Sequence, residues 1–264
     1  MTPSAAISLD HLDIGYRRGR RHYVVGRDLS ASLEAGRLTC LLGSNGVGKS
    51  TLLRTLCGLQ PPLGGSVELM GQPVGSYSTN GLARTVGIVL TQRVDADNMR
   101  VADLVAMGRT PYTGFLGALT PADRRVVDEA MQQVGVAAFA RRMVRTLSDG
   151  ERQKVMIAKT LAQQTPVVLL DEPTAFLDYP SKVEVMRLLR RVAHENHKAV
   201  LLSTHDVEMA LHAADCLWLM DAASLRTGTP AALSANGALS AFFARDGLAF
   251  NGASGRFEWD SSKL

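Results

Sequence analysis

Cysteine is scarce in this sequence. The only three, Cys40, Cys57 and Cys216, lie far apart, form no C-x-x-C pair and are odd in number. They therefore indicate neither a disulfide framework nor a cysteine zinc site. We expect a protein of a reducing compartment, where cysteines stay as thiols.

Long apolar runs are also missing. No stretch approaches the roughly 18 consecutive apolar residues that a membrane-spanning helix requires. The first residues, MTPSAAISLDHLDIGY, lack the basic segment and apolar core of a signal peptide. The chain has 264 residues, of which 46% are hydrophobic, so it can bury a sizeable core. We expect a soluble, folded chain that does not cross a membrane itself.

A strong charge of one sign is the third feature that is absent. The chain carries 29 basic and 25 acidic residues, a net charge of +4 spread along its length, which names no partner. The densest basic run, residues 17–21, is typical of a solvated hairpin turn, with attraction to ATP or to an anionic membrane as the alternative. No DNA-recognition helix is evident, so we expect no nucleic-acid partner.

Apolar segments with strand and helix patterns alternate along most of the chain. Residues 7–42 have the pattern of short strands, and 85–92 that of a buried strand. Helical periods dominate 93–163, after which strands and helices alternate again from 167 to 220. This order predicts an α/β fold with a mainly parallel sheet covered on both faces, interrupted by an inserted helical subdomain.

A phosphate-binding motif lies between a predicted strand and a predicted helix. The pattern G-x-x-x-x-G-K-[ST] is matched by Gly43, Ser44, Asn45, Gly46, Val47, Gly48, Lys49 and Ser50, and Thr51 follows it. Glycines allow backbone N–H groups to surround a phosphate at the positive end of a helix dipole. Lys49 would neutralise the β- and γ-phosphates, and Ser50 would ligate Mg²⁺.

An apolar strand ending in two acids, VVLLDE, supplies the other half of a nucleotide site. Asp171 would hold the magnesium, usually through water. Glu172, at the end of the strand, could polarise an attacking water as a general base. One carboxylate would suffice to bind the metal, so the adjacent pair indicates hydrolysis of the nucleotide.

Two further predicted strands end in polar residues, Gln92 and His205. The carboxyl ends of parallel strands are where α/β sheets build their sites. His205 could hydrogen-bond the γ-phosphate or the water, and Gln92 could contact the magnesium and the water. Taken alone, each is more typical of an ordinary polar residue at a strand end.

The segment Leu147, Ser148, Asp149, Gly150 and Glu151, followed by a helical run, closely resembles the signature of ATP-binding cassette (ABC) proteins. The other motifs occur in the order of that family: Tyr16, the P-loop, Gln92, the signature, Asp171 with Glu172, the D-loop 176–178, and His205.

The resemblance implies a P-loop, RecA-like core made of 1–92 and 164–230, with an N-terminal antiparallel β-subdomain. It also implies a helical signature subdomain at 93–163, leaving a tail, 231–264, that we expect to pack on the core and not to regulate. All of these would form one ABC ATPase domain.

The same resemblance implies a head-to-tail homodimer that binds ATP and Mg²⁺. Ser148 and Gly150 of one subunit would reach the γ-phosphate held by the P-loop of the other. Tyr16 would stack on adenine, and Asp178 would communicate between the two sites.

Asp149 departs from the pattern, because the family usually has glycine there. A carboxylate aimed at triphosphate would repel it, so we expect Asp149 to point away from the phosphates and to cap the signature helix. Aspartate tolerates unusual backbone angles better than most residues, so the turn can survive.

Within the family, MGRTPY (107–112), STHDVEMAL and GTP (228–230) resemble the ATPases that energise uptake of ferric siderophores, haem and cobalamin. This implies two integral membrane permease subunits, fed by a periplasmic or surface binding protein, and a peripheral place on the cytoplasmic face of the inner membrane. The permease would contact the groove near Gln92 and the segment 101–112.

Two other classes of ABC ATPase remain as alternatives. Nucleic-acid maintenance ATPases insert long coiled coils or zinc modules, and this sequence has neither heptads nor cysteine pairs. An iron-sulfur assembly ATPase is the other alternative, against which MGRTPYTGF favours an importer.

Overall fold

The computed structural model describes residues 5–19, 21–90, 96, 98–114, 117–221, 224–244, 248–251 and 256–259. Its first elements are β1 (Ala5–Arg18), β2 (Arg21–Glu34), β3 (Leu38–Leu42), α1 (Lys49–Leu56), β4 (Gly64–Leu69), β5 (Gln72–Pro73), α2 (Thr79–Thr85), β6 (Val86–Val89), α3 (Val101–Ala106) and α4 (Pro121–Gln133). They are followed by α5 (Asp149–Ala162), β7 (Val167–Leu170), α6 (Tyr179–Glu195), β8 (Ala199–Thr204), α7 (Val207–Ala213), β9 (Cys216–Met220), β10 (Leu225–Gly228), α8 (Pro230–Ala235), α9 (Ala238–Phe243), β11 (Leu248–Asn251) and β12 (Arg256–Trp259).

A six-stranded sheet in the order β10-β9-β3-β8-β7-β6 forms the centre of the molecule. All its strands run parallel except β10, which pairs antiparallel with β9. The α/β fold with a mainly parallel sheet is therefore confirmed. Because the strands are parallel, their carboxyl ends meet at one edge, which is where such sheets build their sites.

Both faces of this sheet are buried, and alternate residues of each strand face opposite sides. In β8, Val200 and Leu202 belong to the core formed with α5, α6 and α7. Ala199 and Leu201 belong to the core formed with α1 and the antiparallel sheet. The uninterrupted apolar runs in the sequence follow from this double burial.

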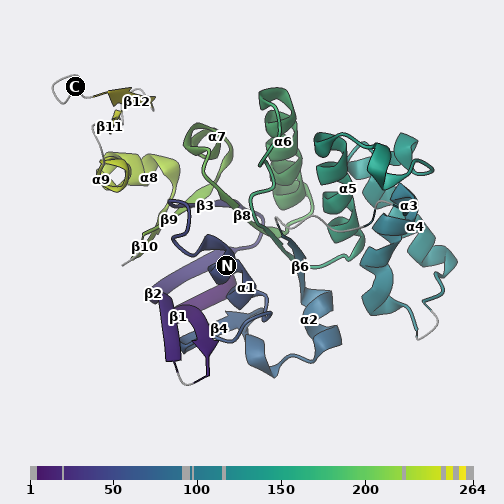
Figure 1. Cartoon of the computed structure of the whole chain (residues 1–264), viewed down its shortest axis with the longest axis horizontal. Coiled ribbons are helices and arrows are strands. Elements are labelled where there is room, and N and C mark those ends of the chain that lie inside the picture. The colour runs from purple at the N-terminus through teal and green to yellow at the C-terminus, as the bar shows by residue number, and fades with distance from the viewer. Residues whose placement is uncertain are drawn as a thin grey trace.

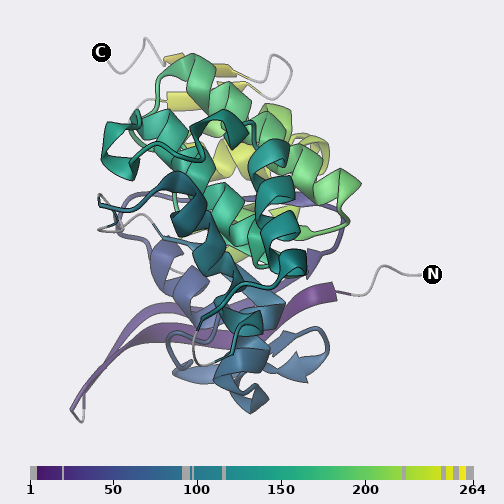
Figure 2. The ribbon, with the colours of Figure 1, turned by 90° about the vertical axis from the view of Figure 1, so that its right-hand side faces the viewer.

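The antiparallel sheet has the order β2-β1-β4-β5. Its strands β1 and β2 form a long hairpin that pairs as far as Arg18 with Arg21 and projects beyond the rest of the molecule in Figure 2. The sequence predicted shorter strands there, because the outer part of the hairpin is polar and carries no apolar alternation. The predicted strand 85–92 also differs: β6 spans Val86–Val89, and α2, capped by Ser78, precedes it.

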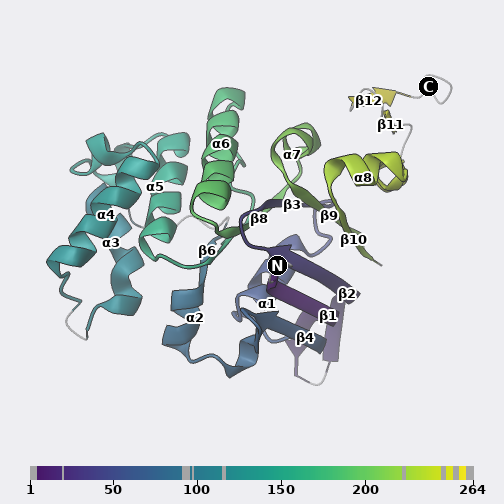
Figure 3. The same cartoon turned by 180° about the vertical axis from the view of Figure 1, so that it is seen from behind.

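Helices α3, α4 and α5 pack on one another at one end of the molecule, and α8 and α9 lie at the other end (Figures 1 and 3). The tail helices are anchored in the core formed with α5, α6 and α7, because Leu233, Leu239 and Phe250 are buried there. The tail thus packs on the same core as the helices that flank the active site.

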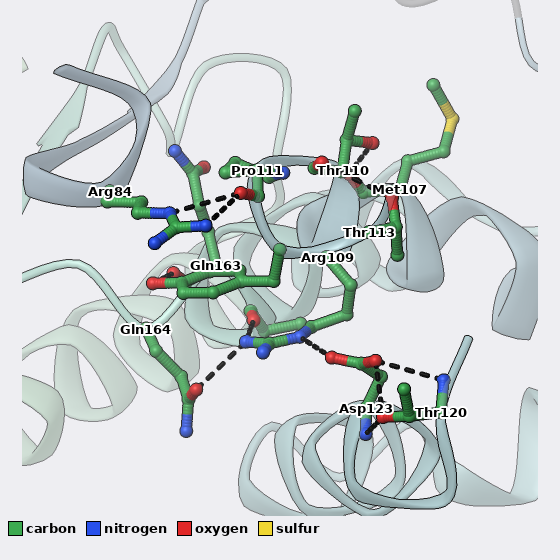
Figure 4. A network of polar contacts seen from close by, with 12 residues as sticks. Arg84, Met107, Arg109, Thr110, Pro111, Thr113, Thr120, Asp123, Gln163 and Gln164 are labelled. Carbon is green, nitrogen blue, oxygen red and sulfur yellow. Dashed lines mark hydrogen bonds and ion pairs between the residues drawn. The ribbon is translucent and has the colours of Figure 1, made fainter. Parts of the chain in front are cut away.

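Arg109, in the short 3-10 helix Met107–Tyr112, ties the helical part together. Its side chain is 6% exposed and contacts Asp123 on α4 with a Nε to Oδ1 distance of 3.0 Å. Its Nη1 donates to the Ala162 carbonyl and the Gln164 side chain at 2.8 Å each, and the guanidinium lies over the Tyr112 ring. Figure 4 shows Arg109 between Asp123 and Gln164.

The ion pair of Arg109 with Asp123 is embedded in further hydrogen bonds. Thr120 donates its N–H and hydroxyl to the Asp123 carboxylate, and these bonds, followed by the Arg109 guanidinium, hold the pKa of Asp123 below its usual value. Arg84 reaches the same segment by donating to the Pro111 carbonyl (Figure 4). Arg109 thus joins α4, the end of α5 and the Met107–Tyr112 segment.

We expect Arg109→Ala to lower the free energy of unfolding by about 3 kcal/mol, because it leaves the buried Asp123 carboxylate without its cation. Arg109→Lys should lose less, since a lysine keeps the charge but cannot form the planar fork. Met107→Ala is the matched control in the same segment, since Met107 is 44% exposed. Urea unfolding of the three variants measures the effect. Equal stability of Arg109→Ala and Met107→Ala would contradict the anchoring role.

Candidate active site

The loop 43–48 connects β3 to α1 at the carboxyl edge of the parallel sheet. Gly46 and Gly48 have φ values of 79° and 113°, a backbone region that favours glycine. A Cβ added to Gly48 would lie 2.4 Å from Val25 Cγ1, so a side chain would clash there as well. The glycines of the motif therefore let the loop turn tightly in front of the helix, with the N–H groups of α1 at its centre.

Lys49 begins α1 and is 5% exposed. Its Nζ donates to the carbonyls of Gly43 at 2.9 Å and Ser44 at 3.2 Å, and lies 3.9 Å from Glu172 Oε1. Burial lowers the pKa of Lys49, and the nearby acids Glu172 and Asp171 act in the opposite direction. The loop thus encloses one buried cation beside two carboxylates, and contact of Lys49 with a phosphate stays a prediction.

Asp171 and Glu172 follow β7, and Ser203 of the neighbouring strand β8 connects them. The Ser203 hydroxyl donates to Asp171 Oδ1 at 2.7 Å and accepts the Glu172 N–H at 2.9 Å. Ser203 is fully buried. Sequence reasoning missed this residue, although a serine inside the apolar run AVLLST was a visible signal. Ser203 therefore fixes the position of both acids relative to the sheet.

His205 follows β8 and places its Nδ1 3.9 Å from Glu172 Oε1. Glu172 itself has a φ of 49°, a conformation that is uncommon for residues other than glycine and that clusters at active sites. The structure therefore brings Lys49, Asp171, Glu172 and His205 together at one edge of the sheet, as the strand-end pattern predicted. Gln92, predicted to join them, lies outside the described residues.

Tyr16 of β1 borders the same edge. Its hydroxyl lies 2.6 Å from Thr51 Oγ1, and its ring is 44% exposed. A cavity of about 260 Å³, here called the P-loop cavity, is lined by Tyr16, Val25, Asn45, Gly46, Gly48, Lys49, Ser50, Thr51 and Glu172. An aromatic face, a phosphate-binding loop and a carboxylate thus meet in one cavity, although stacking of Tyr16 on adenine stays a prediction.

The oxygen atoms at this site fit a magnesium ion. Ser50 at the start of α1 and Asp171 directly after β7 offer a hydroxyl and a carboxylate, the hard oxygen donors that Mg²⁺ prefers. No group of three or more His, Cys, Asp or Glu side chains that could hold a metal occurs among the described residues. The Ser50 hydroxyl and the Asp171 carboxylate suit Mg²⁺, because nucleotide-binding sites hold this ion with one or two carboxylates together with the substrate phosphates.

The predicted signature segment, 147–151, starts helix α5. Ser148 is its N-cap: the hydroxyl accepts the Glu151 N–H at 3.2 Å, and Glu151 Oε2 accepts the Ser148 N–H at 2.8 Å. This backbone hydrogen bond is the main reason that the pKa of Glu151 lies below its usual value. The expectation that Asp149 caps the helix was therefore wrong. Asp149 occupies the first helical position, where its charge favours the helix dipole.

The signature helix begins beside the segment that carries Asp178. A Cβ added to Gly150 would lie 3.3 Å from Ser181 Oγ, and the Ser181 N–H donates to Asp178 Oδ1 at 3.1 Å. Asp178 is the N-cap of α6, and its hydrogen bonds with Ser181 lower its pKa. Among the described residues that line the P-loop cavity, none comes from 147–151. Contact of Ser148 and Gly150 with a phosphate stays a prediction for a pair of chains.

The segment 101–112, predicted to contact a permease, has two exposed polar side chains, Asp103 and Thr110. Arg109 is buried, and the Tyr112 hydroxyl donates to the Gln163 carbonyl at 3.0 Å. Met107 remains exposed. The contact with a permease stays a prediction.

Comparison with known proteins assigns the chain to a class. The profile of the ABC transporter family matches residues 26–175, more than half of the sequence, so the chain belongs to the ABC transporter family. Its enzymatic activity is the hydrolysis of ATP, to which the P-loop and the adjacent acids correspond. Within the described residues, no helix is both long and apolar enough to cross a membrane.

Two relatives and one solved structure are similar to this chain over most of its length. The achromobactin transport ATP-binding protein CbrD of Dickeya dadantii is 41% identical over 80% of this chain and 77% of its own length. The iron(3+)-hydroxamate import ATP-binding protein FhuC of Bacillus subtilis is 37% identical over 78% and 75%. A structure described as a metal-chelate type ABC transporter, in an inward-facing conformation, has a TM-score of 0.76, 28% identity and coverage of 91% and 89%.

We expect Asp149→Gly to change the ATPase rate less than about tenfold, because Asp149 at the first helical turn contributes to the helix start and Ser148 already provides the cap. Asp149→Asn is the matched control, which removes the charge and keeps the side-chain size. Steady-state phosphate release measures both variants. A rise of more than tenfold in both would mean that the carboxylate repels triphosphate.

Proposed function

We propose that this chain is the ATP-hydrolysing subunit of an importer that takes up a metal chelate, namely a ferric siderophore, haem or cobalamin, through a separate permease. The observation that carries the proposal is the meeting of Lys49, Asp171, Glu172 and His205 at one edge of the sheet. The names of the relatives include achromobactin transport and iron(3+)-hydroxamate import ATP-binding proteins. These names support import as the direction of transport and a metal chelate as the cargo.

Each residue of the edge has a role that its geometry supports. The loop 43–48 and the start of α1 bind the β- and γ-phosphates through N–H groups, and Lys49 balances their charge. Ser50 and Asp171 would hold Mg²⁺, which when bound would neutralise the charge that develops on the phosphates. Tyr16 supports the adenine ring on its exposed face.

Glu172 is the general base of the proposed reaction. It accepts a proton from the water that attacks the γ-phosphate, and the Ser203 hydrogen bond to its N–H holds its backbone in place. His205, 3.9 Å from the Glu172 carboxylate, orients the γ-phosphate or that water. Gln92 is assigned to contact the magnesium and the water.

Two copies of the chain act as a head-to-tail pair. The Ser148 hydroxyl of one copy donates a hydrogen bond to the γ-phosphate held by the other. The same hydroxyl still accepts the hydrogen bond from the Glu151 N–H, because a hydroxyl can donate and accept at once. Gly150 adds its N–H at the positive end of α5. ATP thus joins the two copies, and hydrolysis separates them again.

The importer contains this pair, two permease subunits and a periplasmic or surface binding protein that delivers the cargo. The pair sits on the cytoplasmic face of the inner membrane. The permease docks against 101–112, where Met107 is exposed. Because the permease and the binding protein touch the cargo and the ATPase does not, the nucleotide site is the same for each metal chelate.

Glu172→Gln should reduce the ATPase rate at least about a hundredfold, because an amide cannot take the proton from water. ATP should still bind to this variant and hold the chains as a dimer. Lys49→Ala, by contrast, should weaken ATP binding itself. Phosphate release, a fluorescent-nucleotide titration and size-exclusion chromatography measure the three properties. Undiminished turnover of Glu172→Gln would refute the assignment of the base.

The import function is tested with the chain co-purified with its permease in liposomes. A binding protein loaded with ferric siderophore, haem or cobalamin should raise the ATPase rate several-fold for the true cargo only, because binding energy then drives closure of the ATPase pair. The empty binding protein is the control. Equal rates for all three chelates and for the empty protein would contradict metal-chelate import while leaving ATP hydrolysis intact.

A further inference from the structure

Phe176 stands out as an apolar side chain held in water. It is 84% exposed, and its φ of 64° is strained for a bulky residue. Two turns fix it there: the Ala175 N–H donates to the Glu172 carbonyl at 3.0 Å, and the Leu177 N–H donates to the Thr174 carbonyl at 3.4 Å. Leu177 takes the core position beside it. Strain of this kind clusters at functional sites.

A second cavity lies on the other side of the P-loop. This tail cavity has a volume of about 370 Å³ and is lined by Leu42, Gly43, Ser44, Asn45, His205, Val207, Met220, Asp221, Phe242 and Phe243. The rings of Phe242 and Phe243 meet edge to face, with centroids 4.9 Å apart. The C-terminal tail therefore forms an aromatic wall next to the active site.

The exposed ring and the tail cavity border the same catalytic edge. Phe176 follows Glu172 by one turn, and His205, 3.9 Å from the Glu172 carboxylate, lines the tail cavity. Asn45 lines both the P-loop cavity and the tail cavity, so the two cavities are neighbours. Any two-fold pair of chains that meets over this edge presents an exposed phenylalanine and an aromatic cavity from each copy.

We propose that Phe176 of each chain inserts into the tail cavity of a second copy when the ATP-bound pair closes. This rests on the pairing of chains put forward above and adds its specific contact. A two-fold interface makes each contact twice, so two rings leave water together. Large aromatic side chains in pockets are typical hot spots of interfaces, with geometry-dependent attraction between rings beyond the area that they bury.

The contact gives the C-terminal tail a role in closure. Phe243 touches Phe242 on one side and Phe250 on the other, with a centroid distance of 6.5 Å to Phe250. Phe250 and Leu239 are buried in the core formed with α6 and α7. A ring that enters the tail cavity therefore contacts Phe242 and Phe243, which the buried Phe250 holds in place. Closure of the pair would thus change the contacts of the C-terminal tail in each copy.

Photo-cross-linking tests the contact directly. The full chain with Glu172→Gln carries p-azidophenylalanine at position 176, which keeps an aromatic ring there, and is mixed with isotope-labelled chain that has only Glu172→Gln. After irradiation with ATP, adducts should join position 176 of one chain to 207 or 242–243 of the other. The same probe at position 59 is the control, because Leu59 is 62% exposed and does not line the tail cavity.

A double-mutant cycle measures the strength of the contact. In the Glu172→Gln background, Phe176→Ala and Phe243→Ala should each weaken ATP-dependent dimerisation at least about tenfold. The double variant should be no weaker than the weaker single variant, because both changes remove one contact. Leu59→Ala should have no effect. Thermal unfolding of the monomers checks that Phe243→Ala still folds.

Every outcome decides between the alternatives. If a dimer forms with ATP but adducts with the tail cavity are absent, or if the two substitutions are additive, the contact is wrong and the paired mechanism stands. If Phe176→Ala leaves the dimer intact and weakens binding to the permease, the occupant is the permease and the proposal fails. If no dimer forms at any ATP concentration, the paired mechanism fails as well.

Discussion

The burial of one lysine among carbonyl oxygens and carboxylates is the interaction on which the catalytic edge depends. A buried ammonium is stable only with hydrogen-bond acceptors and a nearby negative charge. Lys49 has both, in Gly43, Ser44 and Glu172. Gly43 and Ser44 belong to the loop before α1 and Glu172 follows β7, so the charge requirement of one side chain holds the loop, the start of α1 and the end of β7 together.

The sheet supplies the accuracy that this arrangement requires. β7 and β8 pair in parallel register from Val167 with Ala199 to Leu170 with Leu202, which sets Ser203 beside the two acids. A hydroxyl that donates to one acid and accepts from the backbone of the next leaves neither group free to turn. The sharp positive φ at Glu172 is thus held by a hydrogen bond that the neighbouring strand provides.

The sequence alone predicted the features that depend on neighbours along the chain. The loop 43–48, the helix after it and the acids at the end of β7 are local patterns, and the parallel sheet follows from the alternation of strands and helices. The serine in AVLLST was visible, but the roles of Ser203 and Arg109 could not be assigned, because they depend on strand register and on partners 14 to 55 residues away. The cap of α5 was misplaced by one residue, since Ser148 and Asp149 both favour such a position and only the reciprocal bond with Glu151 decides between them.

Helix α5 connects the signature segment to the Met107–Tyr112 segment. The signature helix starts against Ser181, which is held by Asp178, and it ends where Arg109 joins α4 to Ala162 and Gln164. The C-terminal end of α5 is thus tied by directional polar bonds, its first turn lies beside Ser181, and its middle packs in the apolar core. A helix fixed in this way moves as a rigid unit, because tightly packed interiors transmit displacement and do not absorb it. A displacement of Ser148 would therefore be carried along α5 toward the Met107–Tyr112 segment, which belongs to the surface that we propose for the permease.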